Sequence, residues 1–184
     1  MVISQANLTP TPLQITQEQE TERFFRETAG RWSSQRRYYT LPDGDPQEIS
    51  SIIQIEYLPQ GSEELRHLAR LHQLEDERML LFGSVVSWHS QESITGKKQS
   101  KGETVIGVLG KLLYRDRGFA TPKPVTAEYY LSNPQTLCLR TEYNRSVFEE
   151  EIKLVGQHYR TRQTIISRAG EEQMIGQYLE KRMD

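Results

Sequence analysis

The stretch from Thr136 to Arg168 constrains the fold most strongly, because it predicts three antiparallel strands joined by two tight turns. Side chains on a strand point alternately to opposite faces. The residues that share a face are Cys138, Arg140, Glu142 and Asn144 on the first strand, and Arg160, Arg162 and Thr164 on the third. A carboxylate and two guanidinium groups are therefore expected to line one side of a sheet. Charges on a packed face need a partner or solvent, so this face is either plain surface or the wall of a polar site.

Much of the remaining chain also favours strands. Two segments, 78–90 and 103–116, predict a long hairpin around a polar turn that carries Lys97 and Lys98. Strands with short connections, and without alternating helices, favour an antiparallel sheet that closes into a barrel. We therefore expect a single all-β barrel domain with flanking helices over residues 16–184.

Three segments depart from the strand pattern and are predicted to be helices. The first, 16–29, begins at a capping box formed by Thr16 and the glutamine three positions later. The second, 62–74, has a leucine every three residues, and the third, 171–182, gathers its apolar residues on one helical side. Residues 1–15 contain two prolines and no periodic pattern of apolar residues, so they are expected to form a flexible lead-in.

Composition and charge exclude several classes of function. The chain has 184 residues and a net charge of −2, and its charges are interspersed, so it lacks the basic stripe that binds nucleic acid. Its start does not resemble a secretory signal, and no segment approaches the roughly 20 apolar residues that span a bilayer. We therefore expect a soluble intracellular protein that does not bind nucleic acid and has no membrane span.

Cysteine and histidine residues give little support for catalysis or metal binding by this chain. Cys138 is the single cysteine, which rules out an internal disulfide and fits a reducing compartment. It lies between two leucines in a predicted strand, so a buried structural role is expected rather than a nucleophile. His67 and His72 are five residues apart and do not share a helix face as a metal-binding pair would, so no metal site is expected.

Six segments, taken together in their order, resemble the S-type phycobiliprotein lyases, the CpcS/CpeS family. They are FFRETAGRWSSQRRYY at 24–39, VSWHS at 86–90, KGETVIGVL at 101–109, the stretch RDRGFATPKPVTAEYYL, LRTEYN at 139–144 and YRTRQT at 159–164. The resemblance runs from about Thr21 nearly to the C-terminus.

The resemblance implies a lipocalin-like or fatty-acid-binding-protein-like up-and-down β-barrel of about ten strands, whose cavity holds one small ligand. It further implies a lyase that binds an open-chain bilin, phycocyanobilin or phycoerythrobilin, as its substrate and has no tightly bound cofactor. Such a lyase attaches the bilin by a thioether bond to a cysteine of a phycobiliprotein α or β subunit. The nucleophile then belongs to the client subunit.

The resemblance also implies roles for individual residues. Glu142 and Arg160 are expected to be catalytic. The expected bilin-binding residues are Arg36, Trp88, Glu142, Asn144, Arg160 and Arg162. Arginine is the planar, two-pronged partner that suits the two propionates of a bilin. The Glu142 carboxylate would hydrogen-bond or protonate the pyrrole system and make the ring A ethylidene more electrophilic toward the client thiolate.

Segment 150–154 departs from the family pattern. The sequence EEIKL and a VGQH turn stand where many members have an arginine, an aromatic pair and an Asn-containing turn. This departure favours a subunit that works beside a second S-type protein. A self-dimer is the other assembly that stays open. Two alternatives to a self-sufficient lyase stay open: a non-catalytic partner subunit, and a carrier of a bilin or another lipophilic acid. The expected location is the cytoplasm of a cyanobacterial-type cell or the plastid stroma.

Overall fold

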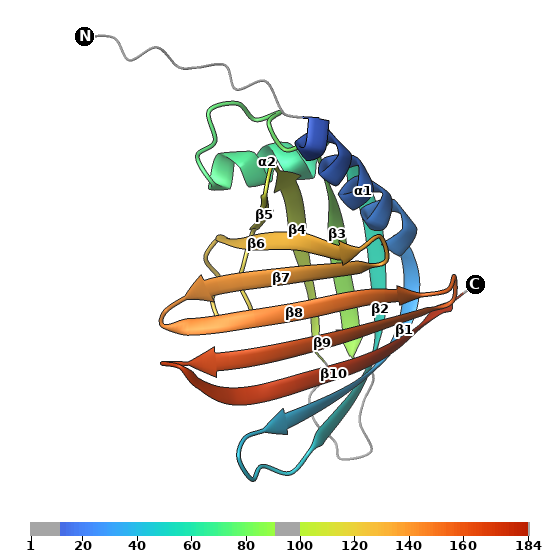
Figure 1. Ribbon diagram of the computed structural model, residues 1–184, viewed down its shortest axis with the longest axis vertical. Helices are drawn as coiled ribbons and strands as arrows, with labels where there is room; N and C mark the ends of the chain where they lie inside the picture. Colours follow the sequence, from blue (N-terminus) through green and yellow to red (C-terminus); the bar gives the residue numbers. More distant parts are fainter. Residues whose placement is uncertain (1–11, 91–99, 184) are drawn as a thin grey trace.

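Ten antiparallel strands form a closed barrel in the computed structural model, which describes residues 12–90 and 100–183 (Figure 1). Each strand pairs with its neighbours in chain order, and β1 closes the ring against β10. The strands are β1 Gly30–Thr40, β2 Gln47–Pro59, β3 Phe82–Ser90, β4 Lys101–Leu109, β5 Leu112–Arg115, β6 Val125–Asn133, β7 Thr136–Tyr143, β8 Ser146–Val155, β9 Tyr159–Arg168 and β10 Glu171–Met183. The predicted antiparallel barrel of about ten strands is confirmed.

The three strands predicted between Thr136 and Arg168 are β7, β8 and β9. The β7–β8 turn consists of Asn144 and Arg145, with φ angles of 51° and 63°. Two successive positive φ angles define the tight hairpin turn whose twist matches that of the flanking strands. The register that this turn sets decides which side chains of β7 and β8 face the barrel interior.

Helix α1, Pro12–Thr28, closes one end of the barrel (Figure 1). It begins four residues before the predicted capping box, so residues 12–15 belong to the helix and not to a flexible lead-in, while residues 1–11 lie outside the described range. Phe24 and Phe25 are buried in the same apolar core as the inner strand faces. The helix is tied to β1 because the Trp32 indole N–H donates to the carbonyl of Thr28 at 3.0 Å.

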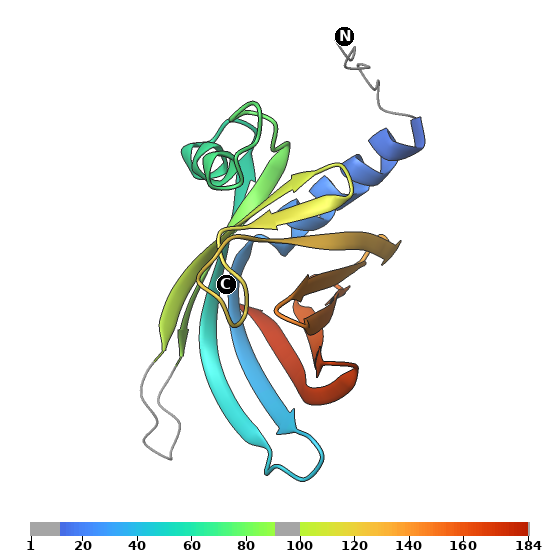
Figure 2. The same ribbon diagram turned by 90° about the vertical axis from the view of Figure 1, so that its left-hand side faces the viewer.

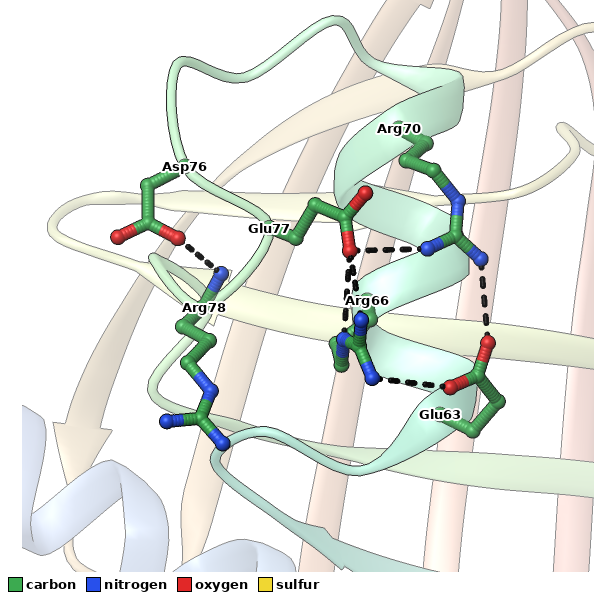
Figure 3. Close-up of polar contacts among 6 residues, drawn as sticks. All are labelled: Glu63, Arg66, Arg70, Asp76, Glu77 and Arg78. Carbon is green, nitrogen blue, oxygen red and sulfur yellow. Dashed lines mark hydrogen bonds and ion pairs between the residues drawn. The ribbon is translucent and has the colours of Figure 1, made fainter.

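Helix α2, Glu63–Leu71, confirms the second predicted helix and packs against the outer faces of β3 and β4. Gly107 permits this contact, because a Cβ atom there would lie only 3.1 Å from Cδ2 of both Leu65 and Leu68 of α2. On the solvent side, two arginines link Glu63 on the helix to Glu77 in the following loop (Figure 3). These arginines are Arg66 and Arg70. Exposed pairs of this kind contribute little stability, so α2 is held mainly by its leucines.

The prediction of a C-terminal helix over residues 171–182 is wrong, because this segment is β10. Its side chains alternate: Gly176, Tyr178 and Glu180 are buried, whereas Leu179 is 51% exposed. The apolar residues at 174, 175, 178 and 179 also fit a helical spacing, but β10 pairs with both β1 and β9. Pairing on both edges satisfies the backbone of the strand and closes the barrel.

The predicted polar turn with Lys97 and Lys98 lies outside the described residues, but the flanking strands β3 and β4 pair as the predicted hairpin does. Within residues 12–90 and 100–183, neither helix is long and apolar enough to cross a membrane.

Candidate functional site

The barrel encloses a cavity of about 460 Å³, a size typical of small-molecule sites. Its apolar wall includes Phe24 and Phe25 from α1, Ile53 from β2 and Trp88 from β3. At the end opposite α1 the cavity is lined by residues of the loop at 116–124, which connects β5 to β6. We call this end the mouth; it faces the viewer in Figure 2.

The first charged cluster on the inner wall is centred on Glu150 of β8, whose side chain is 0% exposed. Its Oε2 accepts a hydrogen bond from Arg115 of β5 at 2.9 Å, and its Oε1 accepts one from Arg162 of β9. Burial opposes ionisation of Glu150, but the two guanidinium groups outweigh it and hold the pKa of this carboxyl below its usual value. Glu150 is therefore a carboxylate at neutral pH.

The second cluster lies deeper, beside the C-terminal end of α1. Arg160 of β9 pairs with Glu180 of β10, and both side chains are buried. Glu180 also accepts a hydrogen bond from Ser34 at 3.2 Å. The Arg160 guanidinium carbon lies 5.1 Å from the Trp32 ring centroid, a favourable cation–π distance. Arg160 is thus held by Glu180, by the Trp32 ring and by the Thr28 hydroxyl, to which its Nη1 donates at 3.5 Å, and it lines the cavity at the same time.

The third cluster is built on Arg36 of β1, and no carboxylate pairs with it among the described residues. Its Nη2 donates to Ser51 Oγ at 2.6 Å and its Nη1 to the Tyr38 hydroxyl at 3.4 Å. The hydroxyls of Tyr38 and Tyr178 are 3.1 Å apart. Burial raises the pKa of Tyr178 above its ordinary value, so this hydroxyl stays protonated. In the part of the chain that the structure describes, Arg36 lacks the carboxylate partner that Arg115, Arg160 and Arg162 each have, so its guanidinium group is available to an anionic ligand.

Aromatic rings continue the inner wall toward the mouth. Phe119 stacks on Phe148 with ring centroids 5.4 Å apart, and Phe148 stacks on Tyr143 at 4.8 Å. The Arg162 guanidinium carbon lies 5.8 Å from the Phe119 centroid and 5.0 Å from that of Tyr178. The cavity thus combines flat π faces with guanidinium groups, an arrangement suited to a conjugated, anionic ligand.

The structure brings four of the predicted site residues to the inner wall. Arg160, Arg162 and Trp88 line the cavity, and Arg36 lies on the inner face of β1 beside Tyr178. All four were named from the sequence as expected site residues, and their role in binding stays a prediction; the carboxylates that hold two of the arginines were missed.

The expectation that Glu142 shares a face with the two β9 arginines is wrong. Glu142 lies on the outer face of β7, where its side chain is 59% exposed and pairs with Arg140 at 2.9 Å. Asn144 is exposed in the β7–β8 turn. The register places Leu139 opposite Glu150, so the odd-numbered residues of β7 face inward.

Five inner-wall residues were missed by the sequence analysis: Arg115, Phe119, Glu150, Tyr178 and Glu180. For Glu150 a signal existed, because it alternates with Phe148 and Ile152 and therefore belongs to the apolar face of its strand. Cys138 is buried but faces outward, away from the cavity. No group of three or more His, Cys, Asp or Glu side chains in the described part of the chain could hold a metal ion.

Comparisons with known proteins agree with this architecture. A family model described as CpeS-like protein matches residues 20–183. The chain is 58% identical, over 90% of its length and 92% of the relative, to "Putative phycocyanobilin lyase CpcS 2" of Nostoc sp.. It is 45% identical to "Putative chromophore lyase CpcV" of Picosynechococcus sp., over 98% of this chain and 90% of the relative.

Among solved structures, the S-type phycobiliprotein lyase CPES from Guillardia theta superposes with a TM-score of 0.75. The match covers 95% of this chain and 99% of that one at 22% sequence identity, so it supports the fold. The family match over nearly the whole chain and the close relatives lead to one conclusion. This chain belongs to the CpcS/CpeS family of S-type chromophore lyases.

Proposed function

We propose that this protein binds an open-chain bilin in the barrel without a covalent bond and attaches it to a cysteine of a phycobiliprotein subunit. The reaction adds the client S–H across the ethylidene double bond of the pigment: a C–S bond forms, and the thiol proton ends on the pigment. No oxidant or reductant is needed. We place this reaction in the cytoplasm of a cyanobacterial-type cell or in a plastid stroma.

The observation that carries this proposal is a surplus of positive charge on the inner wall. Among the strand residues around the cavity, the arginines are Arg36, Arg115, Arg160 and Arg162, and the carboxylates are Glu150 and Glu180. Arg117 of the β5–β6 loop also lines the cavity. At least two strand cations are therefore in excess, enough for the two propionates of a bilin. A buried carboxylate ligand is stabilised by guanidinium partners, and Arg36 can accept one without giving up an ion pair.

Glu150 is the carboxylate we propose for the role that the sequence suggested for Glu142. It is ionised and lies next to two cavity-lining arginines, so it can accept hydrogen bonds from pyrrole N–H groups. A propionate that binds Arg115 or Arg162 would take that arginine away from Glu150. One Glu150 oxygen would then be free to accept hydrogen bonds from the pyrrole N–H groups. Positioning of this kind holds the pigment in one shape while the thiol adds.

Purified protein is expected to bind phycocyanobilin in roughly a one-to-one ratio, because a barrel of this size holds one small ligand. Binding should appear as a shifted visible absorption band. The pigment should be released by acid urea, because Cys138 faces away from the cavity. Pigment that remains attached to Cys138 in acid urea would contradict non-covalent binding.

Replacing Arg36 by glutamine is expected to weaken pigment binding by more than tenfold. A charge-assisted hydrogen bond to a propionate is worth about 1.5–3 kcal/mol. Arg37→Gln is the matched control, because the neighbouring side chain points outward and pairs with Glu48. Titration of absorbance measures both affinities. Equal affinities in the two variants would show that no propionate binds Arg36.

Attachment itself is tested with individual apo-phycobiliprotein subunits and phycocyanobilin, with and without a second S-type protein. Covalent pigment that survives acid urea, formed faster than in the spontaneous reaction, supports a lyase. Activity that requires the second protein would make this chain one subunit of a lyase. Binding without any acceleration in either mixture would instead show a bilin carrier.

A further inference from the structure

The described rim of the mouth has a basic arc. It consists of Arg117 and Lys123 in the loop before β6, Arg145 in the β7–β8 turn and Arg168 at the end of β9. Two hydrogen bonds join these segments: Ala120 N–H donates to the Tyr143 hydroxyl at 2.8 Å, and Ala169 N–H donates to the Arg145 carbonyl at 3.0 Å. Within the described residues, Arg117 alone of the four has a carboxylate within 4 Å, at 3.9 Å from Asp116.

An acidic arc continues the rim on the other side of the β9–β10 turn. It consists of Asp43 and Asp45 in the β1–β2 hairpin and Glu171 and Glu172 at the start of β10, all exposed. Leu41 N–H donates to the Gln173 carbonyl at 2.9 Å and so holds the hairpin beside β10. The two arcs meet where Arg168 pairs in register with Glu171. The described rim is therefore polarised, with cations and anions on separate sides.

The proposed reaction requires a second protein at this rim. The cavity of about 460 Å³ holds a small molecule but not a folded domain, and α1 covers the opposite end. Cys138 of this chain faces outward, so the thiol that meets the pigment must come from the client. A cysteine on a client surface can reach the pigment through the mouth, and the surface around that cysteine then lies against the rim.

We infer, on the basis of the proposed function, that the polarised rim is the docking surface for the client protein. The matching client surface carries acidic residues on one side of its acceptor cysteine and basic residues on the other. Opposite charges would speed the encounter, and the separation of the two arcs would fix the rotation of the client about the mouth. The rim therefore selects which cysteine is presented to the pigment.

The test compares two double variants that change the net charge equally. Lys123→Glu/Arg145→Glu reverses the basic arc. Arg31→Glu/Lys181→Glu reverses two exposed cations near the α1 end of the barrel. The association rate of pigment-loaded protein with each apo-phycobiliprotein subunit is measured at low and at high salt. Pigment affinity is measured separately by absorbance. It should be the same in both variants, because neither pair of residues lines the cavity.

The rim variant is expected to associate at least about tenfold more slowly than the unmutated protein at low salt, and the difference should shrink at high salt. The control variant should associate at the unmutated rate, and all three proteins should bind phycocyanobilin equally.

Equal association rates for rim and control variants would overturn the docking inference while leaving the proposed lyase intact. Failure of the unmutated protein to bind pigment would instead overturn the proposed function. Absence of salt-dependent association of the unmutated protein with every subunit would also overturn docking.

Discussion

Glu150→Gln is expected to slow pigment transfer to the client by about tenfold or more, because a neutral amide accepts weaker hydrogen bonds from the pyrrole N–H groups than a carboxylate does and holds the pigment less firmly in its reactive shape. Pigment binding should survive or tighten, because Arg115 and Arg162 lose their shared carboxylate and become free for propionates. Glutamine keeps the size of the side chain and one acceptor oxygen. A fall in transfer rate without a loss of affinity therefore separates a role in the reaction from a role in binding.

The matched control is Glu142→Gln, which removes an exposed carboxylate from the outer face of the barrel. Its transfer rate should equal that of the unmutated protein. The measurement is the rate of fluorescent holo-subunit formation at saturating phycocyanobilin, with spontaneous attachment measured beside it and the adduct identified by its absorption maximum. Transfer by Glu150→Gln at the unmutated rate would remove Glu150 from the mechanism. Slow transfer by Glu142→Gln alone would place the reactive carboxylate outside the barrel.

The error over Glu142 shows what alternation in a single strand can and cannot predict. Period-two reasoning correctly grouped Glu142 with Cys138, and Arg160 with Arg162. It could not relate the faces of two strands, because that depends on the register set by the two intervening turns. The apolar flanks carried the missing information. Leu139 and Ile152 line the cavity, so the charged residues that alternate with them along each strand, Glu142 among them, face outward.

The segment that became β10 was ambiguous for a different reason. Four apolar residues at 174, 175, 178 and 179 fit one side of a helix, and local sequence offers no further evidence. The strand is stabilised by pairing with β9, which precedes it in the chain, and with β1, which is distant in sequence. A local window of sequence does not reveal the pairing with β1. Its inward Tyr178 and Glu180 contribute to two polar clusters, and both were missed because the segment was expected to be helical.

Arg160→Met is expected to lower the free energy of unfolding by about 3–5 kcal/mol, because it leaves the buried Glu180 carboxylate without its cation. Urea unfolding at neutral pH, followed by fluorescence, measures the loss. The double variant Arg160→Met/Glu180→Leu removes both charges and should recover most of this stability, since apolar residues can replace a buried ion pair. A single variant as stable as the unmutated protein would show that Glu180 does not depend on Arg160.

The double variant also separates the two roles that Arg160 combines. Arg160 holds Glu180 and lines the cavity, so a simple loss of pigment binding in the single variant could reflect unfolding. Recovered stability without pigment binding in the double variant would assign Arg160 a direct contact with the bilin. Recovered stability together with normal binding and transfer would restrict Arg160 to holding the barrel together. The two propionates would then bind Arg36 and the two arginines that share Glu150, Arg115 and Arg162. The Arg36→Gln variant tests the contact with Arg36 independently.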